Sequence, residues 1–376
     1  MPVGGFCAAG FEDVEVAFRA NLTEHGDIGA AFALAAGGEL VVDLWGGYRS
    51  EDRASAWERD TLVNVWSTSK GVTATCIAML VDRGILSYEQ RVAHYWPEFA
   101  AAGKGDATVA MLLSHQAGLA GFREPATVAD LYDQEGAATQ LAAMEPWWEP
   151  GAQSGYHAIT MGHLANALVM RATGKSLGQF AAEELAHYDY SVGLSPSRSI
   201  RAAAMSAPEQ LASTDVANDL SPLQIAVLAN PILDPLLPNS AAWRAAELPS
   251  ANGFATARGL AQLYGQLAME GGSLMRRETI ERASTVERSG IDAVLGIDAQ
   301  WACGFLRNTL GIYGPDESAF GHSGWGGSFA FADPARRIGM GYVMNRMGTD
   351  LMGDPRAVAL VDAAYRSLGE ARPGNR

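Results

Sequence analysis

Ser67 and Lys70 are the residues whose types and spacing best suit covalent chemistry, and they open and close the run Ser67-Thr68-Ser69-Lys70. A strand-like apolar run ends at Trp66 and an apolar helical pattern continues to Arg83, which predicts Ser67 at a helix N-terminus. Residues three apart share a helical face, with Cβ atoms about 5–6 Å apart. A lysine whose pKa is lowered by burial can take a serine proton, and the N–H groups of a helix end suit a developing oxyanion. The pair is a candidate nucleophile and base, although an N-cap serine beside a solvated lysine gives the same pattern.

A second serine lies in a pattern typical of a nucleophile elbow, Gly174-Lys175-Ser176-Leu177-Gly178. That motif requires a strand before the serine, whereas the pattern at 163–173 is helical. Ser176 and Gln179 are instead predicted to form the capping box of the next helix. The segment also lacks the first glycine of a P-loop, since Val169 stands there. We therefore expect Ser176 to be structural.

Two later segments contain further candidate site residues. Tyr156 lies in Ser154-Gly155-Tyr156-His157, just before a helical pattern that begins near Thr160. The segment 321–328 is rich in glycine and enters a predicted strand, and such a strand edge lets a substrate approach the backbone closely. For Tyr156, a core tyrosine with a satisfied hydroxyl is the structural alternative.

The elements that must position these residues follow from hydrophobic periodicity. Strands at 29–36 and 39–45 are predicted to form a hairpin, with a helix at 11–22 covering it. Further helices are predicted at 109–113, 128–144, 160–173, 177–185, 256–270 and 355–368, and strand-like runs at 301–306, 328–332 and 337–344. Because strands lie at both ends with helices between them, we predict an α+β fold. It has one antiparallel sheet flanked by helices and an inserted helical region.

The same pattern predicts the domain organisation of the 376 residues. Residues 1–85 and 290–376 are expected to form a discontinuous sheet region and 86–289 a mainly helical region, together one compact catalytic unit. The chain shows no alternation of strand and helix, which argues against Rossmann and α/β-hydrolase folds.

Composition narrows the class of protein. A hydrophobic fraction of 48% excludes disorder, and a net charge of −15 disfavours nucleic acid as a partner. Three scattered cysteines and seven histidines without ligand spacing predict no metal site and no cofactor. No stretch reaches the roughly 18 apolar residues of a membrane-spanning helix. The N-terminus lacks the basic start and apolar core of a secretory signal, so we expect a cytoplasmic protein.

The order of the candidate residues resembles that of the penicillin-recognising serine hydrolases: S-x-x-K, then a tyrosine, then a basic residue-x-glycine strand. The sequence is similar to the family VIII carboxylesterases, which resemble class C β-lactamases and D-alanyl-D-alanine carboxypeptidases. Further segments that carry this resemblance are Val42-Asp43-Leu44-Trp45-Gly46-Gly47, Tyr95-Trp96-Pro97-Glu98-Phe99, Leu112-Leu113-Ser114-His115-Gln116-Ala117-Gly118-Leu119, 320–327 and Met344-Asn345-Arg346-Met347. The resemblance covers most of the chain and implies a β-lactamase-like fold of class C type.

The resemblance also implies roles for the site residues. Ser67 would be the acylated nucleophile, Lys70 the base that activates it, and Tyr156 the partner of the lysine that protonates the leaving group. The substrate-binding strand edge would comprise His322, Ser323 and Gly324 in place of the lactamase Lys-Thr-Gly, then Trp325, Gly326 and Gly327 in the form typical of the esterases. The backbone N–H groups of Ser67 and Trp325 would form the oxyanion hole.

Two departures from the lactamase pattern bear on the substrate. Ala158 stands where an asparagine holds the amide side chain of a lactam, and His322 replaces a lysine that favours a carboxylate-bearing substrate. Histidine, with a reference pKa of about 6.5, is mostly neutral at pH 7. The expected function is a serine carboxylesterase acting on short-chain acyl esters, with a small-molecule ester as its partner. Acyl transfer, amide hydrolysis, weak β-lactamase activity and a penicillin-binding protein without turnover are alternatives on the same scaffold, and the sequence does not indicate the oligomeric state.

Overall fold

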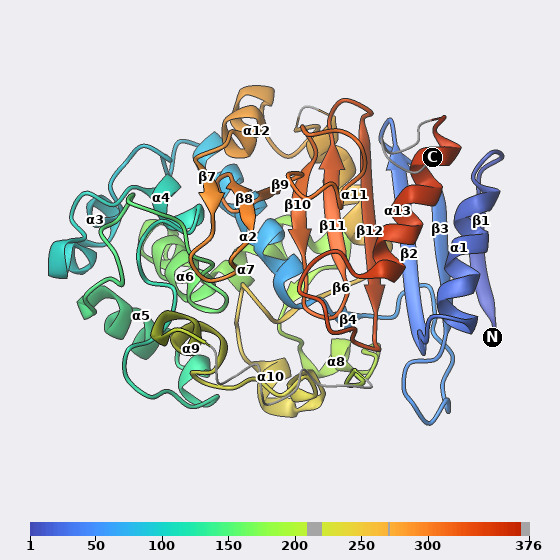
Figure 1. The fold of residues 1–376 in the computed structure, drawn as a ribbon, viewed down its shortest axis with the longest axis horizontal. Helices are drawn as coiled ribbons and strands as arrows, with labels where there is room; N and C mark the ends of the chain where they lie inside the picture. Colours follow the sequence, from blue (N-terminus) through green and yellow to red (C-terminus); the bar gives the residue numbers. More distant parts are fainter. Residues whose placement is uncertain (209–219, 270, 370–376) are drawn as a thin grey trace.

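One large sheet joins the two ends of the chain. The structure is a computed structural model that describes residues 1–208, 220–269 and 271–369. Within these ranges, nine strands form an antiparallel sheet in the order β1-β3-β2-β12-β11-β10-β9-β8-β7 (Figure 1). Their bounds are β1 (Val3–Cys7), β2 (Gly29–Ala36), β3 (Glu39–Gly47), β7 (Arg288–Ile291), β8 (Asp298–Trp301), β9 (Leu306–Arg307), β10 (Phe320–Ser323), β11 (Phe329–Asp333) and β12 (Ile338–Met344). The predicted α+β architecture is confirmed.

The pairing of β12 with β2 brings the C-terminal third of the chain against the N-terminal hairpin. Tyr342 lies opposite Phe32 in the antiparallel register. On one face of the sheet, α11 (Ala257–Ala268) packs against β2, β11 and β12. It approaches closely because Gly339 carries no side chain, and a Cβ there would lie 2.1 Å from the Gly265 nitrogen. On the other face, α1 (Glu12–Thr23) and α13 (Pro355–Ser367) pack side by side (Figure 1).

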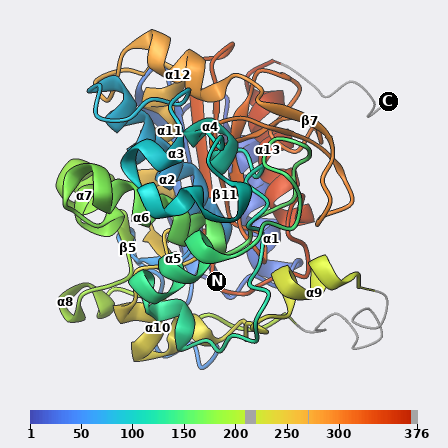
Figure 2. The same cartoon turned by 90° about the vertical axis from the view of Figure 1, so that its left-hand side faces the viewer.

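The helical region lies beside the β7–β10 end of the sheet, with α2 (Ser69–Asp82) between them (Figures 1 and 2). Residues 69–80 of α2 are all buried, and most of them are apolar or small. The other helices are α3 (Val92–Tyr95), α4 (Val109–Leu113), α5 (Gln134–Ala143), α6 (Thr160–Thr173), α7 (Leu177–Glu184), α8 (Pro196–Ser199), α9 (Pro222–Leu228), α10 (Ala241–Ala245) and α12 (Arg277–Ser284). A small sheet, β4 (Val63–Asn64), β6 (Gly253–Ala255) and β5 (Ser191–Val192), supports the start of α2.

Most predicted elements are confirmed, including the hairpin of β2 and β3 and the helices α1, α4, α6, α7, α11 and α13. The capping box is also present: the Gln179 N–H donates to Ser176 Oγ at 3.1 Å, and the Ser176 N–H donates to Gln179 Oε1 at 3.0 Å. Ser176 therefore caps α7 and does not lie on a strand-to-helix elbow.

Two predicted elements are wrong. The segment 128–144 is not one helix, because Asp133 accepts a hydrogen bond from the Gly136 N–H at 2.9 Å and so starts α5. A separate 3₁₀ turn precedes it at Asp130–Tyr132. The run 301–306 is not a strand but the tight connection between β8 and β9, with Gly304 at φ +88°. The sequence analysis also missed β1, which pairs with β3.

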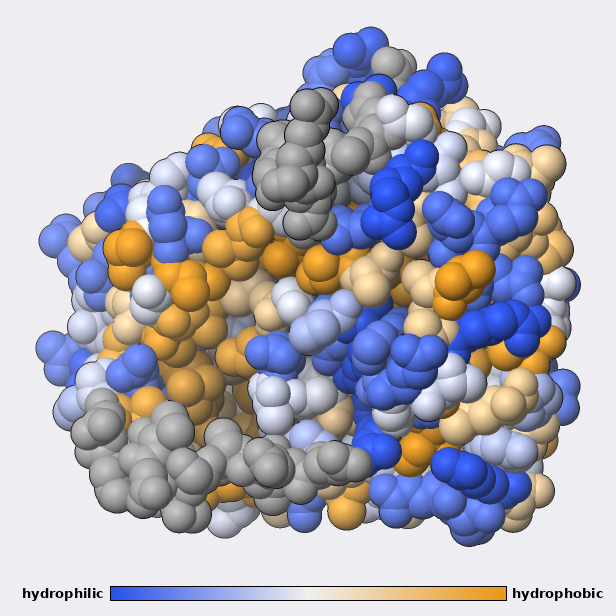
Figure 3. All heavy atoms as spheres, turned by 45° about the vertical axis from the view of Figure 1, so that its right-hand side comes forward, coloured by the Kyte–Doolittle hydropathy of each residue, from blue (hydrophilic) through white to orange (hydrophobic). Residues whose placement is uncertain are grey.

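The surface is mainly polar, but hydrophobic residues gather around a hollowed area of the face shown in Figure 3. None of the helices in the described part of the chain combines the length and the apolar character that crossing a lipid bilayer requires.

A buried charge network anchors the start of α13. The Arg356 guanidinium contacts Asp27 and Asp354, each at 2.7 Å, and Asp27 also accepts from the Tyr342 hydroxyl at 2.5 Å. Arg356 donates as well to the carbonyl of Gly326 at 2.9 Å, just after the predicted oxyanion residue. Burying charges is favourable only when each has its partner, so the network depends on Arg356.

We predict that Arg356→Met lowers the free energy of unfolding by about 3–5 kcal/mol, because it leaves two buried carboxylates without their cation. The midpoint of urea denaturation measures the loss. The matched control, Arg19→Met, breaks the exposed pair of Arg19 with Glu15 and should cost less than about 1 kcal/mol. Equal losses in the two variants would show that the network does not anchor the fold.

Candidate active site

Ser67 lies in a single 3₁₀ turn, Trp66–Thr68, between β4 and α2. The turn is strained, because Trp66 has φ +46°, a region that residues other than glycine seldom occupy. Packing holds it in place: the Trp66 ring lies 5.2 Å from the Trp243 ring and 5.0 Å from the Trp325 ring, measured between centroids. Backbone strain of this kind persists where the surroundings enforce it, and it is found often at functional sites.

Lys70 is fully buried on the first turn of α2, one helical turn from Ser67. Its Nζ lies 3.0 Å from Ser67 Oγ, 2.6 Å from the carbonyl oxygen of Ala158 and 3.0 Å from that of Ser250. No carboxylate in the described residues pairs with it. Burial therefore lowers the pKa of Lys70 well below its ordinary value of 10.5.

These contacts define a hydrogen-bonding pattern for the neutral amine. Its two N–H bonds donate to the carbonyls of Ala158 and Ser250, which can only accept. The lone pair is then left for the third neighbour, the Ser67 hydroxyl, 3.0 Å away. The geometry thus suits transfer of the serine proton to Lys70.

Tyr156 completes the cluster from the loop before α6. Its hydroxyl donates to Ser67 Oγ at 2.7 Å, and its ring stacks on that of Trp301 at 5.8 Å between centroids. Burial, and to a lesser degree the charge of Asp292, raises the pKa of Tyr156, so the phenol keeps its proton at neutral pH. Tyr156 is therefore a hydrogen-bond donor to Ser67 and can serve as a proton donor.

Asp292 positions Tyr156, and the sequence analysis did not single it out. This fully buried carboxylate accepts the backbone N–H of Tyr156 at 3.0 Å and the indole N–H of Trp301 at 3.0 Å. It also accepts the backbone N–H groups of Val294 and Leu295, each at 3.0 Å. One carboxylate thus fixes both the tyrosine and the ring that stacks on it.

The turn between β10 and β11 packs directly on the turn that carries Ser67. Ser328 Oγ lies 3.0 Å from Thr68 Oγ1 and donates to the carbonyl of Val65 at 2.9 Å. Only glycine fits at position 324, because a Cβ there would lie 2.2 Å from the Val65 oxygen. Within the described residues, no group accepts a hydrogen bond from the backbone N–H of Ser67 or Trp325. Both N–H groups are available for an oxyanion.

The other candidates on this strand differ in their surroundings. His322 is buried, its ring lies 6.1 Å from that of Tyr156, and burial with the nearby Lys70 lowers its pKa to about 3. Its Nδ1 lies 2.7 Å from the carbonyl of Ser323, so the neutral ring donates there and leaves Nε2 as an acceptor. The hydroxyl of Ser323 lies 3.0 Å from that of Tyr313. The backbone N–H of Gly326 donates to the Asp350 carbonyl, so this N–H already has a partner within the fold.

A narrow pocket opens beside Ser67. It is lined by Ser67, Tyr156, Leu295, His322, Ser323, Leu351 and Met352. The cavity volume is only about 10 Å³, so the pocket has room for about one water molecule. In the part of the chain that the structure describes, no three His, Cys, Asp or Glu side chains group as metal ligands would.

The fold and the serine–lysine–tyrosine cluster together define an active-site-serine protein with a β-lactamase-like fold. The chain belongs to the beta-lactamase family, whose model matches residues 14–364. It superposes on the crystal structure of a family VIII carboxylesterase with a TM-score of 0.92 and 46% identity, over 98% of this chain and 100% of the other. A penicillin-binding protein homologue from Caulobacter crescentus is also similar, with a TM-score of 0.91 and 41% identity over 98% and 100% of the two chains. The predicted family resemblance and fold are confirmed.

A curated relative, the esterase/beta-lactamase LipL of Mycobacterium tuberculosis (strain ATCC 25618 / H37Rv), is 37% identical over 253 residues. The match covers 61% of this chain and 56% of LipL, so it spans little more than half of that protein.

We predict that Asp292→Asn lowers kcat/KM for an ester about tenfold. The asparagine NH₂ group, which can only donate, would replace a carboxylate oxygen that accepts an N–H, so Tyr156 would be held less firmly. Steady-state kinetics on p-nitrophenyl acetate measure the effect. The control, Asp82→Asn, removes a carboxylate that accepts from Thr279 at the opposite end of α2. It should lose stability with kcat/KM unchanged. The positioning role is refuted if the two variants keep the same kcat/KM.

Proposed function

We propose that this member of the beta-lactamase family is a serine carboxylesterase that hydrolyses short-chain esters through an acyl-enzyme on Ser67. One observation carries the proposal: Ser67 Oγ lies within hydrogen-bond distance of both a desolvated lysine and a tyrosine hydroxyl. The similarity to a family VIII carboxylesterase and to the esterase/beta-lactamase LipL supports the choice of ester as substrate.

In the acylation step, neutral Lys70 accepts the Ser67 proton while Oγ attacks the ester carbonyl. The carbonyl oxygen becomes an oxyanion, which accepts from the backbone N–H groups of Ser67 and Trp325. As the tetrahedral intermediate collapses, the bond to the alcohol oxygen breaks and Tyr156 gives that oxygen its proton. The Lys70 ammonium then returns a proton to Tyr156 through the hydrogen-bonded cluster, so the alcohol leaves neutral and both side chains regain their starting states.

Deacylation follows the same path with water in place of Ser67. Neutral Lys70 accepts a proton from the attacking water, and the water oxygen bonds to the acyl carbon. As this second tetrahedral intermediate collapses, the bond to Ser67 Oγ breaks and Tyr156 gives Oγ its proton. The Lys70 ammonium then returns a proton to Tyr156. The products are the free acid and the original enzyme, with no cofactor in the cycle.

Two features support a small apolar ester over a β-lactam. The narrow pocket beside Ser67 is bounded by the apolar side chains of Leu295, Leu351 and Met352. Neither lactam-binding side chain is present: position 158 is alanine, and His322 is neutral at pH 7 because its pKa is lowered to about 3. A weak β-lactamase activity is the second candidate, favoured by the similarity to LipL and to a penicillin-binding protein homologue.

We predict that Ser67→Ala abolishes ester hydrolysis, by several orders of magnitude in kcat, as removal of a nucleophile does. Ser176→Ala deletes a helix cap and should cost about 1 kcal/mol of stability with little change in rate. The two variants are compared by p-nitrophenyl butyrate turnover and thermal unfolding. If the Ser176 variant were folded but inactive, Ser176 would be assigned as the nucleophile in place of Ser67.

We also predict that kcat/KM for p-nitrophenyl butyrate exceeds that for nitrocefin by a hundredfold or more. The neutral hydrogen bond that Ala158 does not supply is worth about 0.5–1.5 kcal/mol, and the charge-assisted one that neutral His322 does not supply about 1.5–3 kcal/mol. Both substrates are measured on one preparation. Nitrocefin turnover that matches ester turnover would make the protein a β-lactamase.

A further inference from the structure

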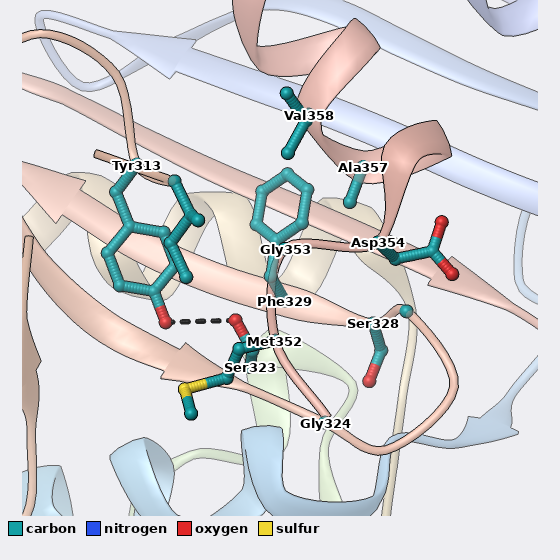
Figure 4. Close-up of a pocket in the computed structure, with 12 residues that line it drawn as sticks. Tyr313, Ser323, Gly324, Ser328, Phe329, Met352, Gly353, Asp354, Ala357 and Val358 are labelled. Carbon is teal, nitrogen blue, oxygen red and sulfur yellow. Dashed lines mark hydrogen bonds between the residues drawn. The ribbon is translucent and has the colours of Figure 1, made fainter. Parts of the chain in front are cut away.

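A second cavity adjoins the pocket at Ser67, since two residues line both spaces. It is lined by residues of β10, β11 and the start of α13, and Figure 4 shows Tyr313, Phe329, Ala357 and Val358 around it. The two spaces share two residues, Ser323 and Met352. The two spaces therefore meet at these side chains.

The second cavity suits an aliphatic group. Its walls include the side chains of Ile312, Phe329, Ala357 and Val358. The polar side chains around it already have partners within the protein. Tyr313 and Ser323 bond to each other at 3.0 Å, Ser328 donates to the carbonyl of Val65, and Asp354 pairs with Arg356. An apolar chain would lose no hydrogen bond there, whereas a charged group would find no free partner.

The proposed mechanism indicates which half of an ester reaches this cavity. Tyr156 protonates the departing alcohol oxygen, so the alcohol portion must begin beside the Tyr156 hydroxyl. That hydroxyl lies at the pocket bounded by Leu295, Leu351 and Met352. A chain that extends from the alcohol oxygen past Met352 enters the second cavity.

We propose that the second cavity is a subsite for the aliphatic chain of the alcohol portion and that Met352 limits the length of chain it receives. This inference rests on the proposed esterase function. Met352 lies on the loop between β12 and α13, followed by Gly353 at φ +74°. As it stands, each space has room for about one water, so an alkyl chain reaches the second cavity only when the methionine side chain is removed or turned aside. Methionine has three rotatable side-chain bonds and adapts readily to a neighbour.

Acetate esters of different alcohols test the proposal without altering deacylation, because ethyl, butyl and hexyl acetate all give the same acetyl-enzyme. The rate of acetate release in a pH-stat gives kcat/KM for each ester. Each methylene that becomes buried is worth roughly fourfold. We expect Met352→Ala to raise the hexyl-to-ethyl ratio of kcat/KM about tenfold, which corresponds to one or two more buried methylenes.

A filling variant identifies where the chain goes. Ala357→Leu narrows the second cavity from α13 without contact with the pocket at Ser67. In the Met352→Ala background it should return the hexyl-to-ethyl ratio to the wild-type value. Ala359→Leu, on the same helix but outside the cavity lining, is the matched control and should leave the raised ratio intact.

Ethyl acetate turnover by every variant shows that it is folded, and Met352→Val replaces the alanine variant if that one does not fold. A raised ratio that Ala357→Leu does not reverse, or no rise in the ratio, would overturn the subsite while the esterase proposal stands. Hydrolysis of no acetate ester by the wild-type protein would instead overturn the proposed function.

Discussion

The structure depends on one buried amine. Lys70 has no exposed surface, and its three neighbours are the Ser67 hydroxyl and two backbone carbonyls, of Ala158 and Ser250. An ammonium ion in such a place lacks the counter-charge that normally makes burial tolerable. The favoured state is therefore a neutral amine that donates twice and has its lone pair toward Ser67. In the proposed mechanism, desolvation makes Lys70 the base, and this base activates the Ser67 hydroxyl as the nucleophile.

The fold supplies this environment from segments far apart in the sequence. The Ala158 carbonyl comes from the loop before α6 and the Ser250 carbonyl from the loop before β6, while α2 is buried on every side. Tyr264 can pack closely on α2 because Gly71 has no side chain: a Cβ at Gly71 would lie 1.9 Å from the Tyr264 hydroxyl oxygen. The strained φ of Trp66 is tolerated because two further tryptophans pack against its ring. The tight packing that buries α2 is thus also what removes water from Lys70 and lowers its pKa.

Much of the fold and of the candidate site was predictable from local sequence patterns. The spacing of Ser67 and Lys70, the strand before them and the helix after them are local features, as are the periodic helices and the Ser176 capping box. The role of Asp292 was not predictable, because nothing near it in the sequence separates it from the other acidic residues. Its function arises from contacts with Tyr156 and Trp301 made by the fold. For the same reason β1 was missed, since its strand character depends on pairing with β3.

The most direct test of the account is the titration of Lys70 itself. The chain contains three lysines, Lys70, Lys104 and Lys175, so ¹³Cε-labelled lysine gives a simple NMR spectrum in which the Lys70 signal is the one lost in Lys70→Arg. The account predicts that this signal titrates well below the ordinary pKa of 10.5, with a neutral amine at the pH of catalysis. A Lys70 signal that stays protonated up to about pH 10, near the reference lysine pKa, would contradict the assignment of Lys70 as the base.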